Sequence, residues 1–406
     1  MRIALFNVKY SANLGDGLLS HCLASELAAS RPNVQVAIYD LAGRSSYGEG
    51  AGRRKTVLGI MNHLPASIRR VIAMSLLGPT VLWRLRPVWA EAITAADAVV
   101  IGGGNLLSDT DLNFPLKIAG LCAEIRNAGR SWELFGVGIA DDWSRFGKKL
   151  FESALLTPLL LRVSVRDARS KILWDAKIAC KGTPAAVVCY DPAVLVCDHF
   201  PAPARIQRSR PVLGLNITAP SEIALHADMG FIAGRAMFEW WVELVRLALQ
   251  AGYEVRLFTN GQMQDQEFLL SLQPVLESSF ATGGRLSFSA VPRNPASLAA
   301  IIADCDVLAG HRLHAHIPAF SYRIPSVGFV WDEKLKSFFE VVGRDDFLMD
   351  MQEASPAEAV GRITHALESG VDQNSWLTAT RAARQQIGEM AALMCSVLAK
   401  KSNDKI

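Results

Sequence analysis

The sequence predicts an α/β protein made of two doubly wound, Rossmann-like parallel sheets. A chain of 406 residues is too long for one ordinary core. Half of its residues are hydrophobic and only 20% are charged, which excludes a disordered chain and allows a large buried interior. In both halves, short apolar runs alternate with helical patterns, as in parallel sheets that helices cover on both faces.

The first half contains six apolar runs of strand length. These expected strands are Ile3–Val8, Val34–Asp40, Ala98–Ile101, Trp132–Val137, Leu160–Val165 and Val187–Tyr190. An amphipathic helix is expected over Leu18–Ala29, between the first two. Residues 198–211 interrupt this alternation with polar residues and prolines, which block both helices and central strands, so the domain boundary is expected there.

The alternation resumes after the boundary and predicts a second doubly wound sheet of about five strands. Its expected strands are Val212–Ile217, Glu254–Thr259, Leu286–Ser289, Val307–Ala309 and Ser326–Phe329. A helix is expected over Phe238–Gln250, ending before Gly252. The predicted domains are therefore 1–197, 212–372, and a C-terminal helix with its tail over 373–406.

Charge and cysteine content exclude several classes of protein. A net charge of +3 gives no global sign of a nucleic-acid partner. The seven cysteines are scattered and form no C-x-x-C pair, so they predict neither a zinc site nor a disulfide framework. The chain starts directly with a strand pattern, without a signal peptide, and no apolar run reaches the roughly 18 residues that span a bilayer. A cytoplasmic protein is expected.

The stretch 56–89 qualifies this expectation. It mixes apolar residues with basic ones, and further basic residues, Arg53, Arg54 and Lys55, come just before it. Such a segment is either a pair of core helices with solvated basic edges or a peripheral contact with an anionic membrane surface. Both interpretations stay open.

Ligands of open α/β sheets bind beyond the carboxyl ends of the strands, so the loops there are the candidate sites. After the first strand, Asn13, Gly15 and Asp16 open a helix, where backbone N–H groups favour an anion; a plain structural turn is an equal alternative. The spacing is not G-x-G-x-x-G, so a dinucleotide site is not predicted.

Two further loops of the first half carry candidate residues. Gly103, Gly104 and Asn105 follow a buried strand, where successive glycines indicate positive φ or close approach of a ligand. Arg166 stands at the end of another strand. It can hold a carboxylate or phosphate, or form a structural ion pair with Asp167 or Asp191.

The densest group of candidates is Gly310-His311-Arg312-Leu313-His314-Ala315-His316, at a strand end and a helix start. A helix N-terminus and an arginine favour an anion, and histidine transfers protons near neutral pH. A zinc site is the rival interpretation, but the spacing does not put three imidazoles on one helical face. Lys334, after the next strand, is a further candidate for phosphate.

These motifs, in this order, resemble those of polysaccharide pyruvyl transferases. The resemblance covers about residues 3–343 and is carried by Asn13-Leu14-Gly15-Asp16, Gly102–Gly104, Arg166-Asp167-x-x-Ser170, Asp191-Pro192, Arg312-Leu313-His314 and the stretch from Ala319 to Lys334. It implies a two-domain, glycosyltransferase-B-like transferase that moves the enolpyruvyl group of phosphoenolpyruvate onto a sugar of an exopolysaccharide or cell-surface glycan.

The resemblance also implies roles for single residues. His314 and Arg312 would be catalytic, with His314 as acid/base, and the donor would be bound by Arg166, Arg312, Leu313, Lys334 and His311. Asn13, Gly15, Asp16, Gly103, Gly104 and Asn105 would form the substrate loops. Phosphoenolpyruvate would be a co-substrate, with no tightly bound cofactor and no metal.

One departure from the family and two rival functions remain. Some members have a histidine in the loop that matches Gly138–Asp142, where this chain has Ala140; Asp141, Asp142, His311 or His316 could supply a base instead. The rivals are a nucleotide-sugar-dependent glycosyltransferase and a non-catalytic scaffold in polysaccharide assembly. The acceptor is expected to be a glycan, with a lipid-linked one suggested by residues 56–89.

Overall fold

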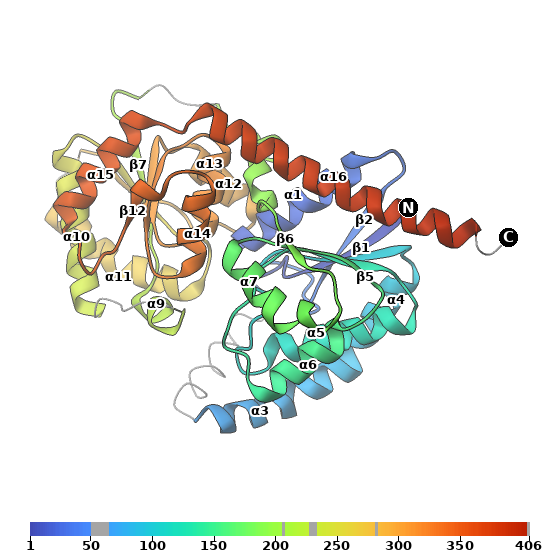
Figure 1. The fold of residues 1–406 in the computed structure, drawn as a ribbon. Coiled ribbons are helices and arrows are strands. Elements are labelled where there is room, and N and C mark those ends of the chain that lie inside the picture. Colours follow the sequence, from blue (N-terminus) through green and yellow to red (C-terminus); the bar gives the residue numbers. More distant parts are fainter. Residues whose placement is uncertain (50–64, 205–207, 227–233, 281–282, 404–406) are drawn as a thin grey trace. The chain divides into compact units, whose positions relative to one another are not determined.

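The computed structural model describes residues 1–49, 65–204, 208–226, 234–280 and 283–403 (Figure 1). The chain divides into two compact units. The first unit consists of Met1–Ser11, Leu19–Pro192 and Ala382–Ile406. The second unit consists of Ala12–Leu18 and Ala193–Arg381.

The first unit contains a six-stranded parallel sheet in the order β2-β1-β3-β4-β5-β6. Its strands are β1 (Arg2–Asn7), β2 (Gln35–Asp40), β3 (Ala98–Gly102), β4 (Trp132–Val137), β5 (Leu160–Val165) and β6 (Ala186–Val188). Its helices are α1 (Leu14–Ser30), whose first turn belongs to the second unit, α3 (Ala66–Pro79), η1 (Thr80–Leu85), α4 (Arg86–Thr94), α5 (Asn113–Asn127), α6 (Arg145–Leu155), α7 (Ala168–Lys177) and η2 (Ala179–Lys181).

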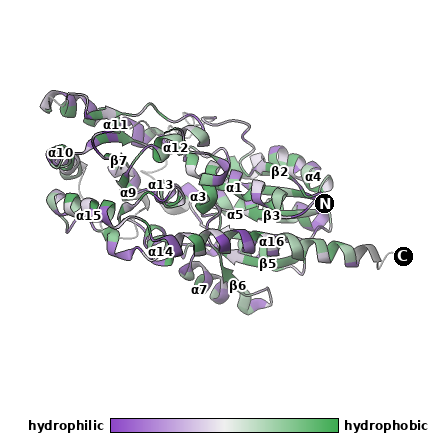
Figure 2. Ribbon diagram, turned by 90° about the horizontal axis from the view of Figure 1, so that it is seen from above, coloured by the Kyte–Doolittle hydropathy of each residue, from purple (hydrophilic) through white to green (hydrophobic). Residues whose placement is uncertain are grey.

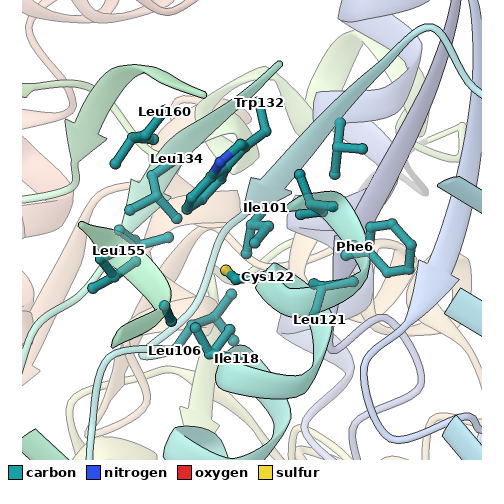
Figure 3. Close-up of a cluster of buried hydrophobic side chains, with 14 of the residues drawn as sticks. Phe6, Ile101, Leu106, Ile118, Leu121, Cys122, Trp132, Leu134, Leu155 and Leu160 are labelled. Atoms are coloured by element: carbon teal, nitrogen blue, oxygen red, sulfur yellow. The ribbon is translucent and has the colours of Figure 1, made fainter. Parts of the chain in front are cut away.

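The core of the first unit lies between this sheet and its helices (Figure 3). Phe6, Ile101 and Leu134 project from three neighbouring strands, and Ile118 and Leu121 meet them from α5. The strands are apolar at almost every position because helices cover both faces of the sheet. All seven cysteines of the chain are free thiols.

The second unit contains another six-stranded parallel sheet, in the order β12-β11-β10-β7-β8-β9. Its strands are β7 (Val212–Asn216), β8 (Glu254–Phe258), β9 (Leu286–Phe288), β10 (Val307–Gly310), β11 (Ser326–Phe329) and β12 (Leu348–Met349). Its helices are η3 (Pro192–Leu195), whose first residue is in the first unit, α8 (Val196–His199), α9 (Pro220–His226), α10 (Gly234–Gln250), α11 (Met263–Ser279), α12 (Pro295–Ala303), α13 (Leu313–Ser321), α14 (Glu333–Val341), η4 (Asp345–Phe347) and α15 (Pro356–Ser369).

One helix, α16 (Gln373–Asn403), begins in the second unit and ends in the first (Figure 1). Figure 2 shows hydrophobic and hydrophilic residues alternating along it, and Ala383, Ile387 and Met394 are buried at helical spacing. In the second unit, the Trp376 indole N–H donates to the Ser321 carbonyl at 3.0 Å. In the first unit, Gln386 Oε1 accepts from the backbone N–H of Tyr190, also at 3.0 Å.

The two doubly wound sheets confirm the predicted fold class. The second sheet has six strands instead of the predicted five or so. The additional strand, β12, has only two residues, which is too short to be recognised as an apolar run in the sequence. Several segments are grouped differently from the ranges 1–197, 212–372 and 373–406: residues 12–18, 193–197 and 373–381 belong with the second sheet, and 382–406 belong with the first. None of the described helices is long and apolar enough to cross a membrane.

Candidate functional site

The strand order marks one position in the second unit. β7 and β10 are adjacent there, yet the chain leaves them in opposite directions, to β8 and to β11. Such a switch point opens the sheet at the carboxyl ends of the two strands, where ligands of doubly wound sheets bind. Arg312 and His314 follow β10 directly, so they stand at this position.

His314 lies in the first turn of α13 and packs against Gly15. Its ψ of 18° departs from helical values, and its side chain is only 6% exposed. A Cβ at residue 15 would lie 2.0 Å from the His314 Cβ, so only glycine leaves room for this contact. The two predicted motifs, almost 300 residues apart in sequence, therefore meet within the second unit.

Asp16 completes this pair. It is an acidic residue in the first turn of α1, and its Oδ1 lies 3.7 Å from His314 Nδ1. A carboxylate beside one ring nitrogen orients a histidine and leaves the other nitrogen for proton transfer. Asn13, Gly15 and Asp16 thus belong to the His314 site.

A chain of asparagines holds residues 12–18 in place. The backbone N–H of Leu14 donates to the Asn260 carbonyl at 3.0 Å, and Asn260 Nδ2 donates to Asn13 Oδ1 at 3.3 Å. Asn216 Nδ2, at the end of β7, donates to Asn260 Oδ1 at 3.0 Å. Asn216 and Asn260 were not among the predicted site residues. Their positions at the ends of the predicted strands 212–217 and 254–259 were the available signal.

Arg312 is already paired with two acids. Its Nε and Nη2 donate to Asp265 Oδ2 at 3.0 and 2.7 Å, and Nη2 reaches Glu222 Oε2 at 3.5 Å. The guanidinium also lies 5.3 Å from the centre of the Trp331 ring. Burial raises the pKa of Asp265, and the neighbouring Arg312 opposes that rise. Neither acid was predicted, because they come from α11 and α9 and only the fold brings them to Arg312.

The other two histidines of the cluster are interior residues. His311 packs between the rings of Trp241 and Phe329, with centroids 6.0 and 5.5 Å away, and burial lowers its pKa to about 3. His316 is hydrogen-bonded to the Gly310 carbonyl at 2.9 Å, and burial lowers its pKa to about 4. Both rings are neutral at pH 7. The prediction that His311 binds an anionic donor therefore has no support in this geometry.

Lys334 lies in the first turn of α14, just after β11, at the carboxyl edge of the same sheet. Its Nζ is 3.2 Å from Asp332 Oδ2, and its side chain is 34% exposed. Asp332 caps α14 by accepting from the backbone N–H of Leu335 at 3.0 Å. Lys334 is thus a cation at a helix N-terminus with access to solvent.

The first unit presents a separate group of residues at the carboxyl edge of its own sheet. Gly103 and Gly104 follow β3 with φ values of +78° and +74°, as the glycine run predicts. The Gly104 carbonyl accepts from the backbone N–H of Gly138 at 2.8 Å, which joins the loops after β3 and β4. A Cβ at residue 138 would lie 2.5 Å from Arg166 Nη2, so this glycine makes room for the arginine.

Arg166 makes longer contacts with its partners than Arg312 does. Its Nε lies 3.4 Å from Asp167 Oδ2, and its Nη2 lies 3.4 Å from Asn105 Oδ1. Asp167 is also the N-cap of α7, since it accepts from the backbone N–H of Ser170 at 2.6 Å. Ser170 Oγ in turn accepts from the backbone N–H of Ile139 at 3.1 Å. The Arg166-Asp167-x-x-Ser170 motif therefore locks together the two loops around Arg166.

The acids proposed as substitutes for a histidine at position 140 have other partners. Asp141 is paired with Lys177 at 2.6 Å, and this lysine lowers the pKa of Asp141. Asp142 Oδ1 accepts from the backbone N–H of Asp109 at 3.3 Å. Among the described residues, no group of three His, Cys, Asp or Glu side chains is placed to hold a metal ion.

One family of proteins matches most of the chain. The family model of polysaccharide pyruvyl transferases matches residues 13–333, a range that includes Arg166, Arg312 and His314 and ends one residue before Lys334. The chain belongs to the polysaccharide pyruvyl transferase family. The resemblance drawn from the motifs is confirmed, and it identifies this pyruvyl transferase family member as a transferase. No match was found among curated proteins.

Solved structures show the same fold at low sequence identity. The UDP-GlcNAc 2-epimerase of Methanocaldococcus jannaschii is 9% identical with a TM-score of 0.55, over 96% of this chain and 99% of the other. The enzyme of that name from Neisseria meningitidis, bound to UDP-GlcNAc, is 10% identical with a TM-score of 0.51, over 98% and 100%. S. aureus MnaA with UDP is 8% identical with a TM-score of 0.51, over 94% and 91%. These likenesses support two Rossmann-like domains and nothing finer.

Proposed function

We propose that this family member transfers the enolpyruvyl group of phosphoenolpyruvate to a sugar of a cell-surface glycan or exopolysaccharide, as a pyruvate ketal, and releases phosphate. The observation that carries the proposal is the pairing of His314 with Asp16 across Gly15, at the switch point of the second sheet. A transfer that begins by protonating carbon needs an acid that titrates near pH 7, and histidine is that residue.

The reaction balances with one acid/base residue. The proton of His314 goes to the methylene carbon of phosphoenolpyruvate, and the oxygen of one sugar hydroxyl bonds to the neighbouring carbon while its proton returns to His314. The bond from that carbon to the phosphate oxygen then breaks, and a second hydroxyl oxygen closes the ketal. The proton of the second hydroxyl leaves with phosphate. Asp16 stabilises the charged imidazole in each cycle.

The charge of the donor must be met by permanent cations. Asp265 and Glu222 already compensate Arg312, so in this proposal Arg312 mainly fixes the start of α13, and with it Leu313 and His314. Lys334 lies at the start of α14 and has a flexible side chain, so in this proposal its ammonium group binds the phosphate or carboxylate of the donor. Arg166 of the first unit, with two contacts of 3.4 Å, is the further cation that the resemblance to the family implies. No tightly bound cofactor is required.

The first experiment is calorimetric titration of the protein with phosphoenolpyruvate, beside UDP-GlcNAc as the nucleotide-sugar. The chain offers a matched pair of variants on α14. Lys334→Ala removes the proposed donor cation, and Lys336→Ala removes a lysine that contacts Glu340 on the same helix. We expect phosphoenolpyruvate to bind, about tenfold more weakly in Lys334→Ala, the effect of losing a charge-assisted contact, and unchanged in Lys336→Ala.

Two results would overturn the proposal. Binding of UDP-GlcNAc without phosphoenolpyruvate would favour a nucleotide-sugar-dependent glycosyltransferase, whose donor class matches the UDP and UDP-GlcNAc bound in two of the structurally similar proteins. If a panel of glycans then gives neither binding nor phosphate release from phosphoenolpyruvate, a non-catalytic role in polysaccharide assembly takes its place.

A further inference from the structure

One helical segment of the first unit carries an unusual share of the exposed apolar side chains. Sixteen large hydrophobic side chains are exposed in the described part of the chain, and seven lie within 21 consecutive residues of α3, η1 and α4. They are Ile68, Val71, Met74, Leu76, Leu82, Trp83 and Val88. Trp83 is the most exposed of the sixteen, at 76%. We call these seven residues the apolar ridge.

The spacing of the ridge residues in α3 places them on one side of the helix. Ile68, Val71 and Met74 recur every three residues, so they lie along one side of α3. Buried residues of the same segment, Val81 of η1 and Trp89 of α4, pack against α5, where a Cβ at Gly120 would be 2.7 and 3.2 Å away from them. The segment is therefore anchored on one side and apolar on the other.

The π-helical turn η1 lies between the two helices of the segment. Pro79 has no N–H to donate within the helix, and the wider turn Thr80–Leu85 follows it immediately. This turn places Leu82 and Trp83 on the exposed side while Val81 and Leu85 stay buried. Trp83 thus projects next to Arg84, which is also exposed.

The charges beside the ridge have one sign. Between Pro65 and Ala90 the sequence has four arginines and no aspartate or glutamate, and the exposed Glu91 of α4 follows the last ridge residue, Val88. Arg69 and Arg86 reach acids of the first unit, Asp111 at 3.1 Å and Glu124 at 2.5 Å, and these ion pairs fasten the segment to the unit. Arg84 stands beside the ridge. An apolar strip with a tryptophan and only basic charge is complementary to the headgroup region of an anionic bilayer.

We propose that the apolar ridge docks this protein on an anionic membrane surface, with α3 and η1 lying in the headgroup region. The part of the predicted contact at 56–64 lies outside the described residues, and the ridge does not depend on it. The docked segment is tied through Asp111 to the chain that follows Gly103, Gly104 and Asn105. One consequence, that the glycan acceptor is carried on a lipid, rests also on the proposed function; the docking itself does not.

Sedimentation with vesicles tests the docking without any donor or acceptor. The probes are vesicles of phosphatidylcholine alone and vesicles with 30% phosphatidylglycerol. We expect binding to the anionic vesicles, weakened by salt, and about a tenfold or greater loss of partitioning for Val71→Ser/Leu76→Ser/Trp83→Ser, since these side chains bury apolar area in the interface. The matched control is Ile172→Ser/Leu270→Ser, which removes exposed apolar side chains elsewhere and should bind as the wild type does.

A second variant covers the case that the triple variant folds poorly. Arg84→Glu reverses an exposed charge and should weaken binding to anionic vesicles several-fold while leaving the thermal midpoint unchanged. Equal binding to both kinds of vesicle, or equal binding by wild type and the variants, would overturn the proposal. So would a dimer in light scattering that the triple variant dissociates, without vesicle binding, because the ridge would then join two copies. These outcomes do not depend on whether phosphoenolpyruvate binds.

Discussion

The two arginines at the strand ends differ in what surrounds them. Their side chains are equally buried, 7% exposed for Arg312 and 8% for Arg166, but Arg312 in the second unit is held by two buried carboxylates, with contacts of 2.7 to 3.5 Å. Arg166 in the first unit has one neighbouring carboxylate and one amide, both at 3.4 Å. A histidine with a carboxylate partner stands beside the first arginine, whereas the described parts of the loops that follow the strands of the first unit contain no histidine. We infer that the residues for proton transfer lie in the second unit. We also infer that neighbouring acids neutralise Arg166 less than Arg312, so that Arg166 can bind an anionic ligand.

The largest expected effect is on His314. His314→Gln should lower the release of phosphate from phosphoenolpyruvate, measured with a glycan acceptor, by about a thousandfold, the usual effect of losing a general acid/base. Binding of phosphoenolpyruvate should change little. His365→Gln, at an exposed histidine stacked on Phe347, is the control and should keep full activity. Full turnover in His314→Gln would show that His314 is not the acid/base residue, and proton transfer could then no longer be assigned to the second unit.

The next effect separates the two arginines by stability. Arg312→Met leaves Asp265 and Glu222 buried without their cation, which should lower the free energy of unfolding by about 3–5 kcal/mol. Arg166→Met should cost only about 1 kcal/mol, since Asp167 keeps its capping bond to Ser170. In contrast, Arg166→Met should weaken binding of phosphoenolpyruvate at least tenfold. Urea midpoints followed by circular dichroism, together with calorimetry, measure both quantities.

A second change checks the cause of this difference. Adding Asp265→Asn to Arg312→Met should recover part of the lost stability, because one of the unpaired buried charges is then gone. If the two arginine variants unfold at the same urea concentration, or if Arg312→Met alone loses donor binding while staying stable, the assignment of roles is reversed.

The smallest effect concerns a titratable group of the first unit that lies away from the strand ends. Glu133 on β4 is 1% exposed, and burial raises its pKa from 4.5 to about 8. The folded protein thus holds a proton that the unfolded chain releases near pH 4.5, so stability is lost as the pH rises from about 4.5 to 8. Glu133→Gln should remove this loss, on the order of 5 kcal/mol.

Thermal midpoints at pH 5 and pH 8.5 test this directly. The variant should match the wild type at pH 5 and melt several degrees higher at pH 8.5. Glu91→Gln, at an exposed position of the first unit, should leave the difference between the two pH values as it is in the wild type. A wild-type midpoint that does not fall between these pH values would show that Glu133 is ionised in the folded protein.

The sequence predicted the strands of this fold better than the long-range contacts between their residues. The ranges 132–137, 160–165 and 326–329 coincide with β4, β5 and β11, because buried parallel strands are continuous apolar runs. The carboxyl-end loops with Gly103, Arg166 and His314 followed from the strand assignments. Asp265 and Glu222 could not be predicted as partners of Arg312, since they follow different strands and only the folded sheet brings them together. The approach of Gly15 to His314 has the same long-range origin.

The division of the chain has a consequence for its synthesis. Residues 12–18 are synthesised before most of the first sheet, yet they belong with the second sheet, which is complete only after β12. The first sheet in turn lacks the end of α16, with Gln386 and Glu389, until that helix has been made. The first unit therefore cannot be complete before the second has been synthesised, although domains usually fold one after another from the N-terminus. A cut within 198–211 would likewise deprive each half of a segment that it needs.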